Sequence, residues 1–161
     1  MASPAGTRRR LSLVTIAIGA EAPRVEGASQ PGPHALLFYK VTCPTCQMAA
    51  EPMARFEEAY PGRLVGVGQD PADALEAFSA TYGLSFASRP DLPPYETSDA
   101  YGIEHVPTLV VVDGGGHVSD VVESWDRDAV NRASATLAGF LGAMPATISD
   151  PSDGLPAFRP G

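Results

Sequence analysis

The chain has 161 residues, enough for one domain of ordinary size that buries its apolar surface without disulfides or a structural metal. It carries 19 acidic and 11 basic residues, and the net charge of -8 excludes the positive field that draws a protein to nucleic acid or anionic lipid. Apolar runs stay well short of the roughly 20 residues that span a membrane, so we expect a soluble chain without a membrane span.

The N-terminal segment has two interpretations. Arg8–Arg10, the apolar stretch Leu11–Ala20 and the small residues around Ala22 resemble an export signal with its cleavage site. However, the apolar stretch is short and weakly hydrophobic, and residues 11–18 alternate as a strand could. We therefore expect a cytoplasmic protein; the alternative is an exported or periplasmic one in which residues 1–22 act as the signal.

The first predicted strand is Ala35–Tyr39, a continuous apolar run typical of a strand buried on both faces. A helix is predicted from Pro44 to about Tyr60, because apolar positions recur near helical spacing. Proline is tolerated in the first helical turn, whereas Pro52 should kink the helix. Cys43 therefore lies where a buried strand gives way to a helix.

A second strand and helix follow along the chain. Leu64–Gly68 is a predicted strand, and Asp70 is expected to cap a helix that runs to about Tyr82. Strand and helix in alternation imply a parallel sheet. Prolines predict a brief strand and an irregular loop over residues 84–95, followed by a short helix at about 96–101.

The last predicted elements are a hairpin and a helix. Thr108–Val112 is an apolar strand, and the glycine-rich turn after it leads into an antiparallel strand at 117–123. Asp126 should cap a helix with its apolar residues on one face. Pro, Ser, Asp and Gly dominate the end of the sequence, so we expect a flexible C-terminal tail over residues 143–161.

Cys43 and Cys46 are the only cysteines, and they stand three positions apart at the start of the first predicted helix. The free N–H groups and dipole of a helix N-terminus favour a thiolate there. Residues three apart share a helix face, so the two sulfurs can form a disulfide. We expect Cys43 to attack a substrate disulfide and Cys46 to resolve the mixed disulfide.

A metal site is another use for two cysteines. Zinc would need two further ligands, and besides carboxylates the chain offers only His34, His105 and His117. A CxxC after a buried strand indicates redox chemistry, and a disulfide closing so small a ring would stabilise the fold little. We expect neither metal nor cofactor, and keep a metal-carrying or other binding module as an alternative.

A second element, Val106-Pro107, lies about sixty residues after the cysteines and just before an apolar strand. Proline is tolerated at the start of a strand because its missing N–H does not remove a hydrogen bond between strands there. Together with the CxxC, it also predicts a cis peptide bond packed against the cysteines, with nearby backbone groups free to bind an extended substrate segment. The residues expected to bind substrate flank these elements: Thr42, Pro44, Thr45 and Val106.

Three stretches, LFYKVTCPTC at residues 37–46, VGVGQD at 65–70 and YGIEHVPTL at 101–109, resemble the thioredoxin-like superfamily. The likeness is to the TlpA-like disulfide reductases and the redoxin group, which is related to AhpC/TSA peroxiredoxins. It covers about residues 17–142, preceded by an N-terminal extension at 1–16. The resemblance implies an α/β thioredoxin fold with a central insertion and a mixed sheet flanked by helices.

The resemblance implies that Cys43 is the nucleophile, Cys46 the resolving thiol and Pro107 the cis-proline beside them. The implied function is a thiol-disulfide oxidoreductase of cell redox homeostasis that reduces or exchanges protein disulfides. Its partners would be protein disulfide substrates and an upstream electron donor, and we expect a monomer.

The sequence departs from the thioredoxin pattern at two positions. Thr42 stands where thioredoxins have Trp, and Leu37 stands near the position of their buried acid. The proton of Cys46 therefore needs another acceptor. The candidates are Glu51, close to the place of an acid in TlpA-like proteins, and His105, just before the cis-proline; a solvated helix glutamate and a loop histidine are the alternatives.

A peroxiredoxin-like thiol peroxidase is the alternative activity. Peroxiredoxins place a threonine three residues before the reactive cysteine, where this chain has Lys40. Thr42 is adjacent to Cys43 and would point elsewhere, because neighbouring side chains of an extended segment face opposite sides. The pattern therefore favours disulfide exchange over peroxide reduction.

Overall fold

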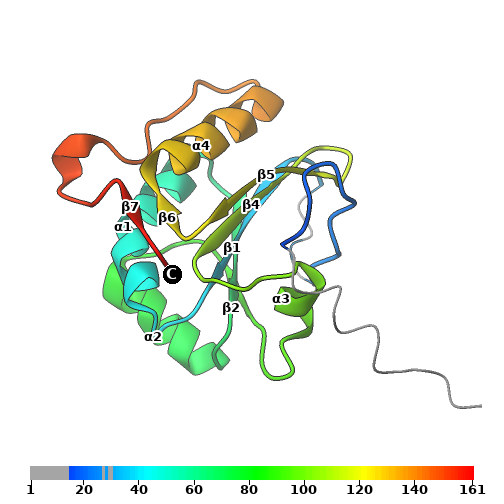
Figure 1. The fold of residues 1–161 in the computed structure, drawn as a ribbon, viewed down its shortest axis with the longest axis vertical. Helices are drawn as coiled ribbons and strands as arrows, with labels where there is room; N and C mark the ends of the chain where they lie inside the picture. The colour runs from blue at the N-terminus through cyan, green and yellow to red at the C-terminus, as the bar shows by residue number, and fades with distance from the viewer. Residues whose placement is uncertain (1–14, 27, 29–30) are drawn as a thin grey trace, which may run out of the picture.

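The computed structural model describes residues 15–26, 28 and 31–161; the predictions for Arg8–Arg10 and residues 11–14 lie outside that range. A five-stranded mixed sheet with the order β3-β2-β1-β4-β5 forms the centre (Figure 1). The strands of this sheet are β1 (His34–Tyr39), β2 (Leu64–Gly68), β3 (Ser88–Pro90), β4 (Thr108–Val112) and β5 (Val118–Glu123). The helices are α1 (Pro44–Ala59), α2 (Ala72–Tyr82), α3 (Glu96–Ala100) and α4 (Arg127–Leu141).

Strand β1 is the centre of the sheet. It pairs in parallel with β2, with Leu37 opposite Gly66, and antiparallel with β4, with Leu37 opposite Leu109. Every residue of β2 and β4 is buried, which explains why these strands read as unbroken apolar runs. Strand β5 alternates buried and partly exposed residues because it is the last strand on its side of the sheet.

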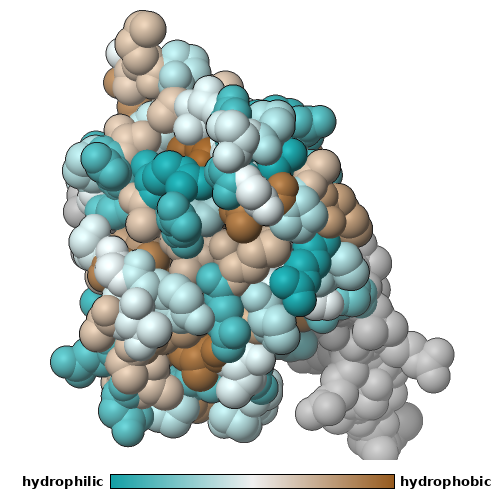
Figure 2. Space-filling model, turned by 90° about the vertical axis from the view of Figure 1, so that its left-hand side faces the viewer, coloured by the Kyte–Doolittle hydropathy of each residue, from teal (hydrophilic) through white to brown (hydrophobic). Residues whose placement is uncertain are grey.

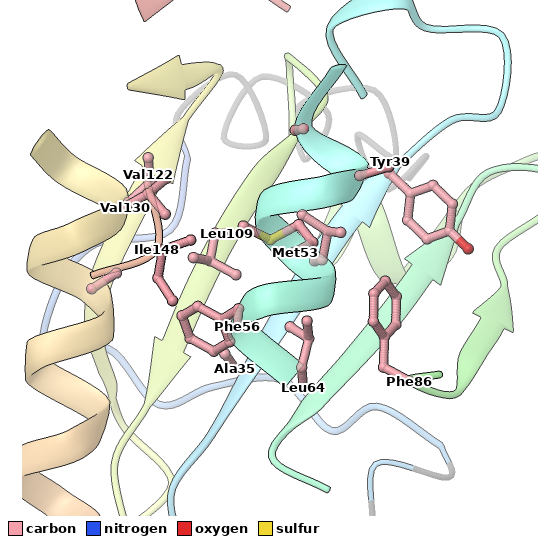
Figure 3. Packing of buried hydrophobic residues seen from close by; sticks show 14 of the residues in the cluster. Ala35, Tyr39, Met53, Phe56, Leu64, Phe86, Leu109, Val122, Val130 and Ile148 are labelled. Carbon is pink, nitrogen blue, oxygen red and sulfur yellow. The ribbon is translucent and has the colours of Figure 1, made fainter. Parts of the chain in front are cut away.

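Helices cover the two faces of the sheet unequally. On one face α1 and α4 pack against the strands, and Figure 3 shows Met53 and Phe56 of α1 among Leu109, Val130 and Ile148. On the opposite face, Tyr101 at the end of the central insertion and Val25 of the N-terminal segment pack against the sheet. The arrangement is the α/β fold with a mixed sheet flanked by helices that the sequence predicts.

Helices α1, α2 and α4 lie together on the left in Figure 1, and their outer surface is turned toward the viewer in Figure 2. Hydrophilic residues interrupt the hydrophobic ones across this surface (Figure 2). It therefore has the mixed character of a solvated helical layer.

The N-terminal segment is bound to the domain by backbone hydrogen bonds. The N–H of Ile16 donates to Tyr101 O at 3.0 Å, and Gly19 and Ala20 exchange two bonds with Val118 at 2.7 and 2.9 Å. The N–H of Ala22 donates to Gly116 O at 2.8 Å. The described part of the strand expected at 11–18 is irregular, but it is built into the fold next to β5.

The segment after α4 differs from the flexible tail that the sequence predicts. Ile148 is 1% exposed and joins the core beside α1 and α4. The indole N–H of Trp125 donates to Pro156 O at 2.7 Å, and Arg127 Nη2 donates to Leu155 O at 2.6 Å. Strand β7 (Phe158–Arg159) pairs antiparallel with β6 (Trp125–Asp126). The segment is thus held by side chains that donate to its backbone carbonyls and by pairing with β6, and composition does not reveal these contacts.

Removal of residues 1–22 should destabilise the protein. A chain that begins at Pro23 lacks four backbone hydrogen bonds of the N-terminal segment, each worth about 1 kcal/mol net. We expect the free energy of unfolding in urea to fall by about 2–4 kcal/mol. A chain that begins at Thr15 is the reference, because it keeps these four hydrogen bonds; equal stability of the two shortened chains would contradict the role of residues 15–22.

Candidate active site

Cys43 occupies the N-cap position of α1. Its Sγ accepts the backbone N–H of Cys46 at 3.1 Å, and Pro44 follows as the first helical residue. Cys43 is half-buried, whereas Cys46, one turn further along the helix, is 4% exposed. Both are free thiols in the structure. The Cys43 sulfur thus lies at the N-terminus of α1, which is the position that the sequence predicts.

The predicted cis peptide bond between Val106 and Pro107 is present. Because Phe38 pairs with Thr108, the residues just before β4 lie beyond the end of β1, where the cysteine loop begins. The Cys43 thiol donates to the carbonyl oxygen of Val106 at 3.4 Å. The structure therefore brings Cys43, Cys46 and Val106-Pro107 together from segments sixty-three residues apart.

The two thiols have different surroundings. Burial raises the pKa of Cys46 well above that of a free thiol, and the hydrogen bond with the Cys43 thiol raises it further. A backbone hydrogen bond from Lys40 lowers this pKa, and the negative charges of Cys43 and Asp70 add smaller increases. Cys46 is thus kept as a neutral thiol until a base takes its proton.

The loop that carries Cys43 is held from both sides at Val41. The N–H of Val41 donates to Asp70 Oδ2 at 2.8 Å, and the Gln47 side-chain amide donates to Val41 O at 2.9 Å. The prediction of Asp70 as the cap of α2 is therefore wrong: Pro71 is the N-cap residue, and no side chain caps that helix. The ends of parallel neighbours β1 and β2 meet at one edge, which places Asp70 beside the cysteine loop.

The predicted substrate-binding residues have different positions. Thr42 and Pro44 are exposed on either side of Cys43. Thr45 is buried, and its hydroxyl donates to the carbonyl of Pro160 at 2.7 Å. Val106 is half-buried beside Cys43. Of these four residues, Val106 contacts the outer sulfur, and both Thr45 and Val106 lie against the C-terminal segment.

The structure does not place the predicted proton acceptors against Cys46. The Glu51 side chain is 84% exposed, and its carboxylate lies 3.2 Å from Arg55 on the outer surface of α1. It follows Cys46 by five residues, about 140° around the helix, and so faces another direction. His105 is exposed, and its carbonyl accepts a hydrogen bond from Thr108. Asp70 is the carboxylate whose charge acts on Cys46, and sequence reasoning gave it another role.

Two features are absent from the part of the chain that the structure describes. Among residues 15–26, 28 and 31–161, no group of three or more His, Cys, Asp or Glu side chains could hold a metal ion. Within the same residues, no helix is long and apolar enough to cross a bilayer.

Comparisons with known proteins place the fold. No protein-family model and no curated protein sequence matches the chain. Among solved structures, MTB dsbF in mixed oxidised and reduced forms has 28% identity and a TM-score of 0.58, over 66% of this chain and 81% of that one. A secreted Mycobacterium tuberculosis disulfide oxidoreductase homologous to E. coli DsbE has 22% identity and a TM-score of 0.60, over 82% and 100%. A putative thiol:disulfide interchange protein DsbE from Chlorobium tepidum has 19% identity and a TM-score of 0.65, over 80% and 98%.

The fold and the position of the cysteines define a class. The chain has a thioredoxin fold with a CxxC pair at the start of α1, and the predicted resemblance to the thioredoxin-like superfamily is confirmed. One of these solved neighbours is described as a disulfide oxidoreductase and another as a putative thiol:disulfide interchange protein, and together with the CxxC pair at the start of α1 these descriptions agree with the oxidoreductase class expected from the sequence.

Substitution of Asp70 by Asn tests its electrostatic effect on Cys46. The amide oxygen of Asn can still accept the Val41 N–H, but the negative charge is lost, so the pKa of Cys46 should fall. The measurement is the pH dependence of the ultraviolet absorbance of the Cys46 thiolate in a Cys43→Ser background, because the buried thiol is poorly accessible to an alkylating reagent. Asp73→Asn, which removes an exposed carboxylate at the start of α2, is the matched control and should leave the profile unchanged. An unchanged or raised Cys46 pKa in Asp70→Asn would refute the effect.

The raised pKa of Cys46 also predicts how stability depends on pH. Its contribution to stability is complete below the unfolded thiol pKa of about 8.5 and is lost as the pH rises above it. Between pH 8.5 and 10, Cys43→Ser should therefore lose up to about 1.4 kcal/mol per pH unit relative to Cys43→Ser/Cys46→Ala. Urea unfolding of both variants gives the difference between their free energies of unfolding at each pH, and the contributions of the buried tyrosines cancel in this difference. If the two free energies changed in parallel with pH, the pKa of Cys46 would not be raised by folding.

Proposed function

We propose that the protein is a thiol-disulfide oxidoreductase that reduces or exchanges disulfides of protein substrates through Cys43 and Cys46. The observation that carries this proposal is the position of Cys43 Sγ, 3.1 Å from the Cys46 N–H at the start of α1 and 3.4 Å from Val106 O. The Cys46 N–H can donate to this sulfur when it attacks as a thiolate, and the contact with Val106 places the sulfur at the edge where an extended substrate segment can bind.

In the proposed reaction, the Cys43 thiolate attacks one sulfur of a substrate disulfide. The substrate S–S bond breaks, a mixed disulfide with Cys43 forms, and one substrate sulfur leaves as a thiolate. Cys46 then loses its proton and attacks Cys43 Sγ, which releases the second substrate thiolate. The substrate gains two electrons, the chain is left with a Cys43–Cys46 disulfide, and an upstream dithiol donor restores the two thiols.

The buried environment of Cys46 sets the order of these steps. Its raised pKa disfavours attack until a base is present. The substrate thiolate that leaves in the first step can accept this proton, because the thiol and charge of Cys43, which raise the Cys46 pKa, are no longer present once Cys43 is part of the mixed disulfide. The resolving attack thus follows capture of the substrate, which limits wasteful oxidation of the pair.

The proposal includes a cytoplasmic monomer. Residues 16–22 are bonded to β5 and Tyr101, and cleavage after Ala22 would remove these contacts, which favours retention of the segment. One solved neighbour is described as secreted, so N-terminal sequencing of the protein from its native host is the deciding measurement. Light scattering tests the monomer.

Trapping of the mixed disulfide tests the proposed function. Cys46→Ser should accumulate a covalent adduct with a disulfide-bonded protein substrate, because the outer sulfur can attack but cannot be displaced. Cys43→Ser is the matched control and should form no adduct, since Cys46 is 4% exposed. Intact mass and a thiol count provide the readout.

Two results would overturn the proposal. One is a wild-type chain that keeps both thiols after treatment with a mild oxidant. The other is consumption of hydrogen peroxide, dependent on Cys43, that outpaces reduction of every disulfide substrate tested; this would favour the thiol peroxidase. Equilibration with dithiothreitol or glutathione buffers then gives the reduction potential, which decides the direction of electron flow.

A further inference from the structure

The last described residues, 158–161, lie across the cysteine site. Strand β7 pairs with β6, and the chain then runs toward the start of α1 (Figure 1). The carbonyl of Pro160 accepts the Thr45 hydroxyl at 2.7 Å, and the N–H of Gly161 donates to Ser124 Oγ at 3.0 Å. Residues 158–161, here called the C-terminal strap, thus connect the cysteine helix with the strands opposite it.

The C-terminal strap approaches the backbone on the other side of Cys43. A Cβ atom added at Gly161 would collide with the carbonyl oxygen of Val106 and lie 3.3 Å from its nitrogen. That carbonyl oxygen is the acceptor of the Cys43 thiol. Only glycine leaves room for this approach, because the obstructing atoms belong to the backbone and cannot rotate away.

The strap therefore contacts two of the groups that would bind a substrate. Thr45 follows Cys43 by two residues, and Val106 precedes the cis-proline. An extended segment presenting a disulfide to Cys43 has to pass between the same two residues. Strap and substrate therefore cannot occupy this edge together.

The anchoring of the strap is uneven along its length. Leu155 and Pro156 are fixed by Arg127 and by the Trp125 indole. Residues 158–161 are exposed and are held by the two-residue pairing with β6, by the hydrogen bonds of Pro160 and Gly161, and by a 3.9 Å contact of Arg159 with Met48 Sδ. The anchor keeps the strap next to the site, while the strap itself can be displaced.

We infer that the C-terminal strap is an autoinhibitory occupant of the substrate groove, which an extended, disulfide-bearing protein segment displaces. The inference rests on the proposed function of Cys43 and Cys46. It predicts that the chain in its resting state reacts slowly with bulky thiol reagents and with protein disulfides. Opening of the strap would then control access to Cys43.

Substitution of Gly161 by Ala in the full chain is the test, since the added methyl group cannot fit beside Val106 O. The rates of Cys43 alkylation by a bulky maleimide and of exchange with a peptide disulfide should both rise at least about threefold, because reactivity scales with the fraction of open molecules. Gly139→Ala on α4, where a Cβ meets nothing within 4 Å, is the matched control and should react like the wild type.

A synthetic peptide with the sequence of residues 155–161 provides a second readout. Added to Gly161→Ala, it should restore slow alkylation, whereas the same peptide with Ala in place of the last Gly should not. Equal rates in wild type and Gly161→Ala, without an effect of the peptide, would overturn the inference. Failure of the proposed function would give a different result. The alkylation rate of Cys43 would still rise in Gly161→Ala, but neither the wild type nor the variant would reduce a disulfide.

Discussion

The hydrogen bond from the Cys46 N–H to Cys43 Sγ, at 3.1 Å, is the interaction on which the site depends. It places the outer sulfur at the positive end of α1 and sets the inner sulfur one turn deeper, among core residues. Burial penalises charge at the second position. Two chemically identical side chains thus lie in different surroundings, although only three positions separate them in the sequence.

The sheet supplies the remaining parts of the site through its register. Pairing of Tyr39 with Gly68 ends β1 and β2 at the same edge, so Asp70 meets the cysteine loop at Val41. Pairing of Phe38 with Thr108 brings Val106 to that edge from the antiparallel neighbour. Neither contact involves residues close in sequence; both follow from buried strands whose side chains prevent a change of register.

The local elements were predictable because their signals are local. Strands β2 and β4 coincide with the predicted ranges, since continuous apolar runs between turn residues admit few other structures. The cis bond at Pro107 was predictable only together with the CxxC. Asp70 was assigned wrongly because a residue before a helix has a local use as a cap, and its actual partner is twenty-nine residues away. The exposed position of Glu51 follows from helical spacing and could have been found by that criterion. The packing of the C-terminal segment could not have been found in this way, because its backbone carbonyls accept hydrogen bonds from side chains distant in the sequence, such as Trp125.

A tethered strap and a free substrate compete on unequal terms. A short tether gives the strap an effective concentration on the order of millimolar, which a dilute protein substrate cannot match by reversible binding alone. A substrate that carries a disulfide can still compete with the strap, because attack by Cys43 forms a covalent bond with it. The captured substrate then no longer takes part in the reversible binding equilibrium. A segment without a disulfide gains no such advantage and is excluded by the strap. The strap would therefore select for the chemistry of the substrate as well as its shape, since brief openings suffice for capture only when a bond can form.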